Sequence, residues 1–88
     1  MMRQEIEILN KLGLHARPSG QLAQLAGMFA SEVWLERGER RINAKSIMGI
    51  MMLAAGQGRR LILETSGRDE EAAMKAIVEL IENRFGEE

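Results

Sequence analysis

Short segments with two different apolar periods alternate along this chain, and their order constrains the fold more than any other sequence feature. In residues 5–8, isoleucine alternates with glutamate, which is the period of a strand with one buried face. A break at residues 10–13 follows. A helix is then predicted from Arg17, with an apolar stripe at Leu22, Leu25, Ala26 and Phe29.

The middle of the chain is predicted to form a hairpin followed by a short helix. Alternation around Val33, a turn at residues 37–39 and a return over residues 40–43 are typical of two antiparallel strands. Ser46 is a good N-cap for a helix from Ile47 to about Ala54.

The last third of the chain adds one strand and one helix. Residues 61–65 are an aliphatic run of strand length, and Asp69 is the expected N-cap of the helix that follows. The buried face of this helix is predicted to carry Ala73, Met74, Ile77, Leu80 and Ile81. The tail at residues 86–88 is expected to fray.

The resulting order, β-α-β-β-α-β-α, predicts an α/β (α+β) fold. Strands with one apolar face need helices on that face only, so we expect an open-faced sandwich with a four-stranded antiparallel sheet and three helices on one face. With 88 residues, of which 45% are hydrophobic, there is room for one core, and residues 1–88 are predicted to be a single domain. Trp34 falls on the polar side of its strand and is expected to be exposed, without a function.

Composition excludes several classes of function. The chain has no cysteine and one histidine, so disulfides, thiolate chemistry and the usual zinc sites lack their residues, and no metal or other cofactor is expected. A net charge of -1 and three aromatic residues argue against nucleic acid as a partner, including the small RNA-binding modules of similar strand order. No signal-like or membrane-spanning run is present, so we expect a cytoplasmic protein without membrane insertion.

The segment Gly13-Leu14-His15-Ala16-Arg17-Pro18 lies where the first loop becomes the first helix. The backbone N–H groups of Ala16 and Arg17 would have no partner there, and the Arg17 guanidinium is a natural phosphate ligand. A neutral imidazole is a nucleophile near pH 7, and its phosphorylated form can pass the group onward. The alternative is that His15 only caps or packs at the helix start. No acidic residue in the loop or first turn can complete a catalytic triad.

The short second helix is apolar on both sides. A helix in so small a domain cannot bury its whole circumference, so Ile47, Met48, Met51 and Met52 are predicted to form a patch that docks partners. The alternative is an unusually methionine-rich core helix. Ser46 is explained by N-capping alone, with Asn43 as a weaker candidate, but a phosphate on Ser46 would place negative charge beside the patch.

Two motifs, residues 13–18 and Asn43-Ala44-Lys45-Ser46-Ile47-Met48-Gly49, resemble the HPr family of phosphocarriers of the bacterial phosphoenolpyruvate phosphotransferase system. The resemblance covers nearly the whole chain. It implies that His15 accepts phosphate on Nδ1 from phospho-enzyme I and donates it to enzyme IIA domains, with Arg17 as the supporting cation. Such a protein is a carrier in a relay and not an enzyme. The partner-binding residues are then expected to be Ala16, Gly20, Ile47, Met48, Met51 and Met52.

The same resemblance implies a regulatory role for Ser46, the residue that an ATP-dependent HPr kinase/phosphorylase modifies in one branch of the family. A transcriptional regulator is a further candidate partner, and the chain is expected to be a monomer. Its first helix has Gly20, Gln21, Gln24 and Gly27 where sugar-type carriers often have alanine and lysines. A nitrogen-type or purely regulatory relative, and a domain that binds an anion at His15 without reacting, therefore stay open.

Overall fold

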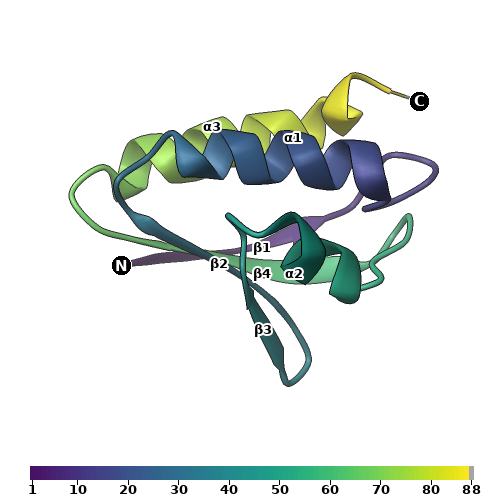
Figure 1. The fold of residues 1–88 in the computed structure, drawn as a ribbon, viewed down its shortest axis with the longest axis horizontal. Helices are drawn as coiled ribbons and strands as arrows, with labels where there is room; N and C mark the ends of the chain where they lie inside the picture. Colours follow the sequence, from purple (N-terminus) through teal and green to yellow (C-terminus); the bar gives the residue numbers. More distant parts are fainter. Residues whose placement is uncertain (88) are drawn as a thin grey trace.

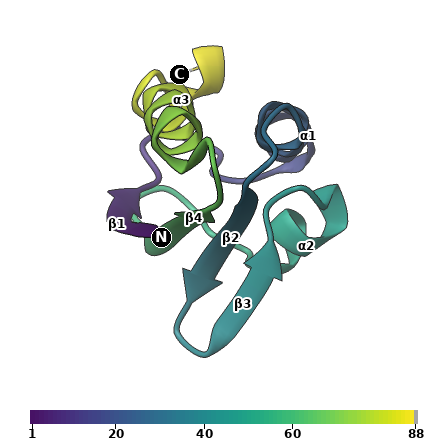
Figure 2. The ribbon, with the colours of Figure 1, turned by 90° about the vertical axis from the view of Figure 1, so that its left-hand side faces the viewer.

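The computed structural model describes residues 1–87 as a twisted antiparallel sheet with helices on one face (Figures 1 and 2). The four strands are β1 (Met2–Glu7), β2 (Glu32–Arg37), β3 (Arg40–Asn43) and β4 (Arg60–Ser66). The helices are α1 (Ala16–Gly27), α2 (Ile47–Met52) and α3 (Glu70–Glu82), followed by the short 3-10 turn η1 (Arg84–Gly86). The predicted fold class and element order are confirmed.

The strands lie in the order β1-β4-β2-β3, so the first strand pairs with the last. Ile6 lies opposite Leu61 in the β1–β4 pair, and Leu35 lies opposite Leu63 in the β2–β4 pair. All four side chains are buried. Because side chains alternate between the two faces of a strand, this register places the aliphatic residues together under the helices.

Each helix contributes one apolar stripe to a common core. α1 buries Leu22 and Ala26, α3 buries Ile77 and Ile81, and α2 buries Ile50. α1 and α3 lie side by side over the sheet, whereas α2 lies below α1, beside the β2–β3 hairpin (Figure 2). None of the helices in residues 1–87 is long and apolar enough to cross a membrane.

Asp69 is the N-cap residue of α3, as predicted, but its side chain does not make the expected capping hydrogen bond. Its carboxylate makes no hydrogen bond to the N-terminus of α3 and instead accepts from the backbone N–H groups of Ala30 and Ser31, both at 2.9 Å, and from the Ser31 hydroxyl. These bonds lower the pKa of Asp69 to about 2, with the Ser31 hydroxyl as the main cause. Asp69 therefore joins the α1–β2 loop to the start of α3. The Gly67 N–H is bound by Glu70 instead, at 3.0 Å.

The outer face of the sheet carries a network of charges around Trp34. Glu64 accepts from Arg41 at 2.9 Å and from Arg3 at 2.5 Å, and both arginines also pair with Glu36. Arg41 and Arg3 lower the pKa of Glu64 to about 2. The Arg41 guanidinium lies over the Trp34 ring, 4.7 Å from its centre, and Trp34 is half-buried rather than exposed as predicted.

Several element ends differ from the predictions. β1 runs from Met2 to Glu7, so it begins three residues earlier than the predicted 5–8 and ends one residue earlier. α1 ends at Gly27, before the predicted stripe residue Phe29. α2 ends at Met52 rather than near Ala54, which is exposed and has a left-handed φ of 51°. The chain turns back toward β4 there, and Ala55 is buried instead.

Candidate functional site

The loop between β1 and α1 is fixed against the connection from α2 to β4. The Leu14 N–H donates to the Ala55 carbonyl at 2.9 Å. Gly13 has a φ of +69°, and a Cβ at this position would lie 2.5 Å from the Ala55 oxygen and 2.7 Å from the Gly56 Cα. Glycine is therefore required at position 13 both for the backbone conformation and for the close approach. This contact fixes the place from which His15 projects.

His15 is the residue immediately before α1. Its backbone is extended, its carbonyl accepts the Ser19 N–H at 3.0 Å, and its ring makes no capping hydrogen bond to the helix. The His15 side chain is 36% exposed. The alternative that the His15 side chain caps the helix therefore does not hold, and the ring is accessible to solvent.

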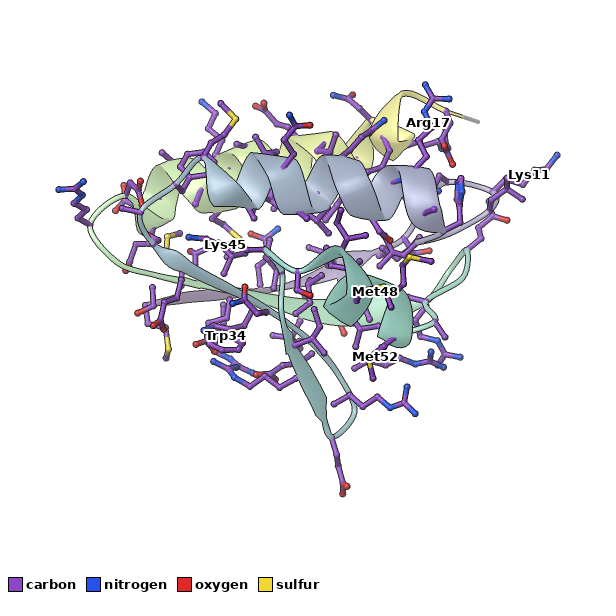
Figure 3. All side chains as sticks on the ribbon, in the orientation of Figure 1. Lys11, Arg17, Trp34, Lys45, Met48 and Met52 are labelled. Atoms are coloured by element: carbon purple, nitrogen blue, oxygen red, sulfur yellow. The ribbon has the colours of Figure 1, made fainter. Side chains whose placement is uncertain are left out.

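The first turn of α1 presents unused backbone donors beside the ring. Within residues 1–87, the Ala16 and Arg17 N–H groups make no hydrogen bond, and Pro18 has no N–H. No acidic side chain lies in this turn. Because the helix dipole adds partial positive charge at the same end, this surface favours an anion. The exposed Arg17 side chain projects from the same end of α1 (Figure 3).

An acidic residue from the far end of the chain contacts His15, which the sequence interpretation missed. Glu87 Oε1 lies 2.9 Å from His15 Nε2 and accepts from Asn10 Nδ2 at 2.9 Å. The hydrogen bonds from His15 and Asn10, with the charge of Arg17, lower the pKa of Glu87. The prediction of a frayed tail is thus wrong for Gly86 and Glu87, and Glu88 lies outside the described residues.

The segment after α3 is held in place by Phe85. The Phe85 side chain is buried in the main core, and Arg84 and Phe85 have left-handed φ values of 56° and 55°. This conformation turns the chain back across the start of α1, so that Glu87 meets His15. Two successive left-handed non-glycine residues are not a pattern that sequence periodicity detects.

The apolar residues of α2 separate into a buried and an exposed set. Ile50 and Leu53 are fully buried, whereas the other set is exposed to 47% at Ile47, 70% at Met48, 40% at Met51 and 64% at Met52. We call this second set the α2 patch. Figure 3 labels Met48 and Met52 on α2, which lies below α1 in this view. The alternative of a wholly buried methionine-rich helix does not hold.

α2 is fixed at both of its ends. The exposed Ser46 caps it, because the Ser46 hydroxyl accepts the Gly49 N–H at 3.1 Å, while the Asn43 side chain accepts the Lys45 N–H at 2.8 Å instead. At the other end, Arg40 donates to the Met52 carbonyl at 2.7 Å, and Arg37 donates to the carbonyls that follow.

The predicted partner-binding residues of α1 lie near this patch. α1 and α2 pack against each other, and Ala16 is exposed at the start of α1. Gly20 is half-buried, and a Cβ added there would meet nothing within 4 Å. The surface at Gly20 is therefore open, and no contact inside residues 1–87 requires a glycine there.

The fold is that of known small phosphocarriers. Residues 2–83 match the family model described as "PTS HPr component phosphorylation site". The chain is 58% identical over 87 residues to a phosphocarrier protein HPr of Cupriavidus necator, covering 99% of this chain and 98% of the relative. It is 55% identical over 87 residues, with the same coverage, to a phosphocarrier protein HPr of Neisseria meningitidis.

A solved structure agrees with these relatives. The crystal structure of HPr-C-His from Thermoanaerobacter tengcongensis superposes with a TM-score of 0.96 at 52% identity, covering 100% of this chain and 99% of that one. The chain belongs to the HPr family, the phosphocarrier proteins of the phosphotransferase system.

Proposed function

We propose that this protein accepts a phosphoryl group from phospho-enzyme I on His15 and passes it to enzyme IIA-type acceptors. It acts as a single HPr-like domain, residues 1–88, and as a cytoplasmic monomer. It is a carrier in a phosphotransfer relay rather than an enzyme, and it needs no cofactor. Arg17 and the backbone N–H groups of Ala16 and Arg17 hold the phosphoryl oxygens.

One observation carries this proposal: an exposed imidazole stands beside backbone donors that have no acceptor within the described residues. A phosphoryl group on the ring would supply oxygens to these donors, in the positive field at the start of α1. A phosphoimidazole is reactive enough to transfer its group, which suits a carrier.

The second part of the proposal concerns partners and regulation. Ala16, Gly20 and the α2 patch form the surface that docks enzyme I and the enzyme IIA domains, since exposed methionines adapt to several partners. An HPr kinase/phosphorylase phosphorylates Ser46, and a transcriptional regulator is a further partner. The exposure of Ser46 at the start of α2 supports access by a kinase.

The test is incubation of the protein with phosphoenolpyruvate and enzyme I, followed by intact-mass and peptide mass spectrometry. We expect one acid-labile phosphoryl group on His15 and none on the His15→Ala variant. Phosphate that persists on His15→Ala would overturn the assignment. Anion binding at the start of α1 without any transfer would instead favour a non-reacting regulatory domain. Transfer onward only to nitrogen-type acceptors would place the protein in the nitrogen branch of the family.

A further inference from the structure

The His15 ring is held by a short relay of side chains from two distant parts of the chain. Glu87 Oε1 lies 2.9 Å from His15 Nε2 and 2.9 Å from Asn10 Nδ2. Asn10 also donates to the Gly13 carbonyl at 2.8 Å. The relay therefore connects the loop that carries His15, the segment after α3 and one nitrogen of the ring.

The direction of these hydrogen bonds determines where the ring proton lies. A carboxylate only accepts hydrogen bonds, so Nε2 must carry the proton that Glu87 accepts. In the neutral ring the lone pair then belongs to Nδ1. Within residues 1–87, Nδ1 makes no hydrogen bond.

We propose that Glu87 is a positioning residue for His15, and that Asn10 in turn positions Glu87. Glu87 keeps the proton on Nε2 and the lone pair on Nδ1, and it stabilises the charge that the ring acquires during transfer. The kinetic part of this inference rests on the function proposed above, whereas the part about the ring proton does not.

The transfer step explains why a carboxylate is useful at this position. The Nδ1 lone pair attacks phosphorus and forms an N–P bond. The bond from phosphorus to the donor breaks, and its electron pair stays on the donor. The proton remains on Nε2, so the ring becomes positive, 2.9 Å from the Glu87 carboxylate. When the group moves on, the N–P electrons return to Nδ1 and the ring is neutral again.

The burial of Asn10 argues that the relay has more than an incidental role. Asn10 is fully buried, and within residues 1–87 its Oδ1 has no hydrogen-bond partner. An unpaired buried oxygen costs free energy, so an apolar residue would suit the core better unless the amide N–H groups are needed. Both of those N–H groups are used, one on the His15 loop and one on Glu87.

The first experiment changes Glu87 and observes the ring directly. In 15N-labelled protein, at a pH about two units above the ordinary histidine pKa, we expect wild-type Nε2 to be protonated and Nδ1 to be unprotonated. In Glu87→Ala the two 15N shifts should move toward each other as the tautomers mix. Glu87→Gln retains an acceptor oxygen without the charge and should preserve most of the wild-type spectrum. Glu82→Ala, an exposed change on α3, is the matched control.

The second experiment measures the rate of phosphorylation by phospho-enzyme I in the same variants. We expect Glu87→Ala to slow it about tenfold, as loss of a group that orients a histidine does elsewhere. Glu87→Gln should fall between Glu87→Ala and wild type because it lacks the charge, and Glu82→Ala should match wild type. Thermal melts identify any variant that slows transfer only by unfolding.

A double-mutant cycle tests the role of Asn10. If Asn10 acts largely through Glu87, Asn10→Ala should slow transfer, and Asn10→Ala/Glu87→Ala should lose less rate than the product of the two single losses. Rate losses that multiply would contradict the relay. Unchanged 15N shifts and an unchanged rate in Glu87→Ala would overturn the whole inference and leave Glu87 as a tail anchor. Failure of wild type to accept phosphate would reject the proposed function, while the 15N spectra would still test the positioning.

Discussion

Ser46 uses one hydroxyl oxygen for a structural contact and offers the same oxygen for the proposed modification. The oxygen accepts the Gly49 N–H at 3.1 Å and so caps α2. A phosphate there keeps oxygens within reach of the helix start, and it brings about -1.5 to -2 charges next to the α2 patch. Modification should therefore leave the fold intact and act on partners.

We expect protein phosphorylated on Ser46 to accept phosphate from enzyme I more slowly than unmodified protein, because the added charge repels the donor. Ser46→Asp should give a weaker effect, and Ser46→Asn is its matched control, since both side chains cap helices well but only one is charged. Transfer rates at low salt, where repulsion is least screened, provide the measurement. Equal rates for modified and unmodified protein would contradict the proposed regulation.

At the residue scale, the sequence predicted what lies close together along the chain and missed what lies far apart. His15, its neighbouring N–H groups and the Ser46 cap belong to single turns, so local spacing was enough to place them. Glu87 is 72 residues from His15 and reaches it only because Phe85 is buried and the chain turns. Asp69 was assigned to its own helix because capping is the common local role, but it binds a loop 38 residues away.

At the scale of elements, α2 is a short helix that contributes only one buried residue to the core. Only Ile50 is buried along its six residues, and its ends are held by Ser46, Arg37 and Arg40. The helix therefore stays in place without burying its methionines. A polar change on the exposed side should leave its structure unaffected.

We expect Met48→Glu to weaken enzyme I binding by about tenfold while the melting temperature stays close to that of wild type, since Met48 is 70% exposed. Isothermal titration calorimetry and a thermal melt measure the two effects. Met28→Glu is the matched control, because Met28 is equally exposed but lies after α1, outside the patch. A loss of several kcal/mol in stability for Met48→Glu would mean that the residue is core.

At the scale of elements, apolar periodicity predicted some features of the fold and could not predict others. The apolar stripe of α1 and the alternation of β2 were sufficient to predict those elements. The exposed side of α2 could be predicted only from the small size of the domain, because its sequence is apolar all round. The half-burial of Trp34 depends on Arg41 from the neighbouring strand, which no single-strand pattern contains.

At the scale of the whole molecule, Asp69 joins two segments that are far apart in the sequence. Its carboxylate holds the α1–β2 loop against the start of α3. The pKa of Asp69 is about 2 in the folded protein, below its ordinary value of 3.8. A carboxylate with a depressed pKa stabilises the fold fully above its ordinary pKa, and this contribution is lost as the pH falls toward 2.

We therefore expect Asp69→Asn to be less stable than wild type at neutral pH and to lose less of its remaining stability between about pH 4 and 2. Asparagine has one acceptor oxygen, and its amide N–H group would face the donors of Ala30 and Ser31. Urea unfolding at several pH values measures both effects, with the exposed Glu71→Gln as control. The carboxylates of Glu36, Glu64, Glu70 and Glu87, whose pKa values are also lowered, leave some acid sensitivity in every variant.

The strand order has a consequence for how the chain folds during synthesis. β4 lies between β1 and β2, so β1 has no partner strand and β2 has only β3 until residues 60–66 have left the ribosome. Before that point only the β2–β3 hairpin can pair, and the aliphatic faces of β1 and α1 remain without the strand that completes the core. Pairing between segments so far apart is slow compared with local helix or hairpin formation. The chain therefore completes its sheet and core late, once β4 is available for pairing.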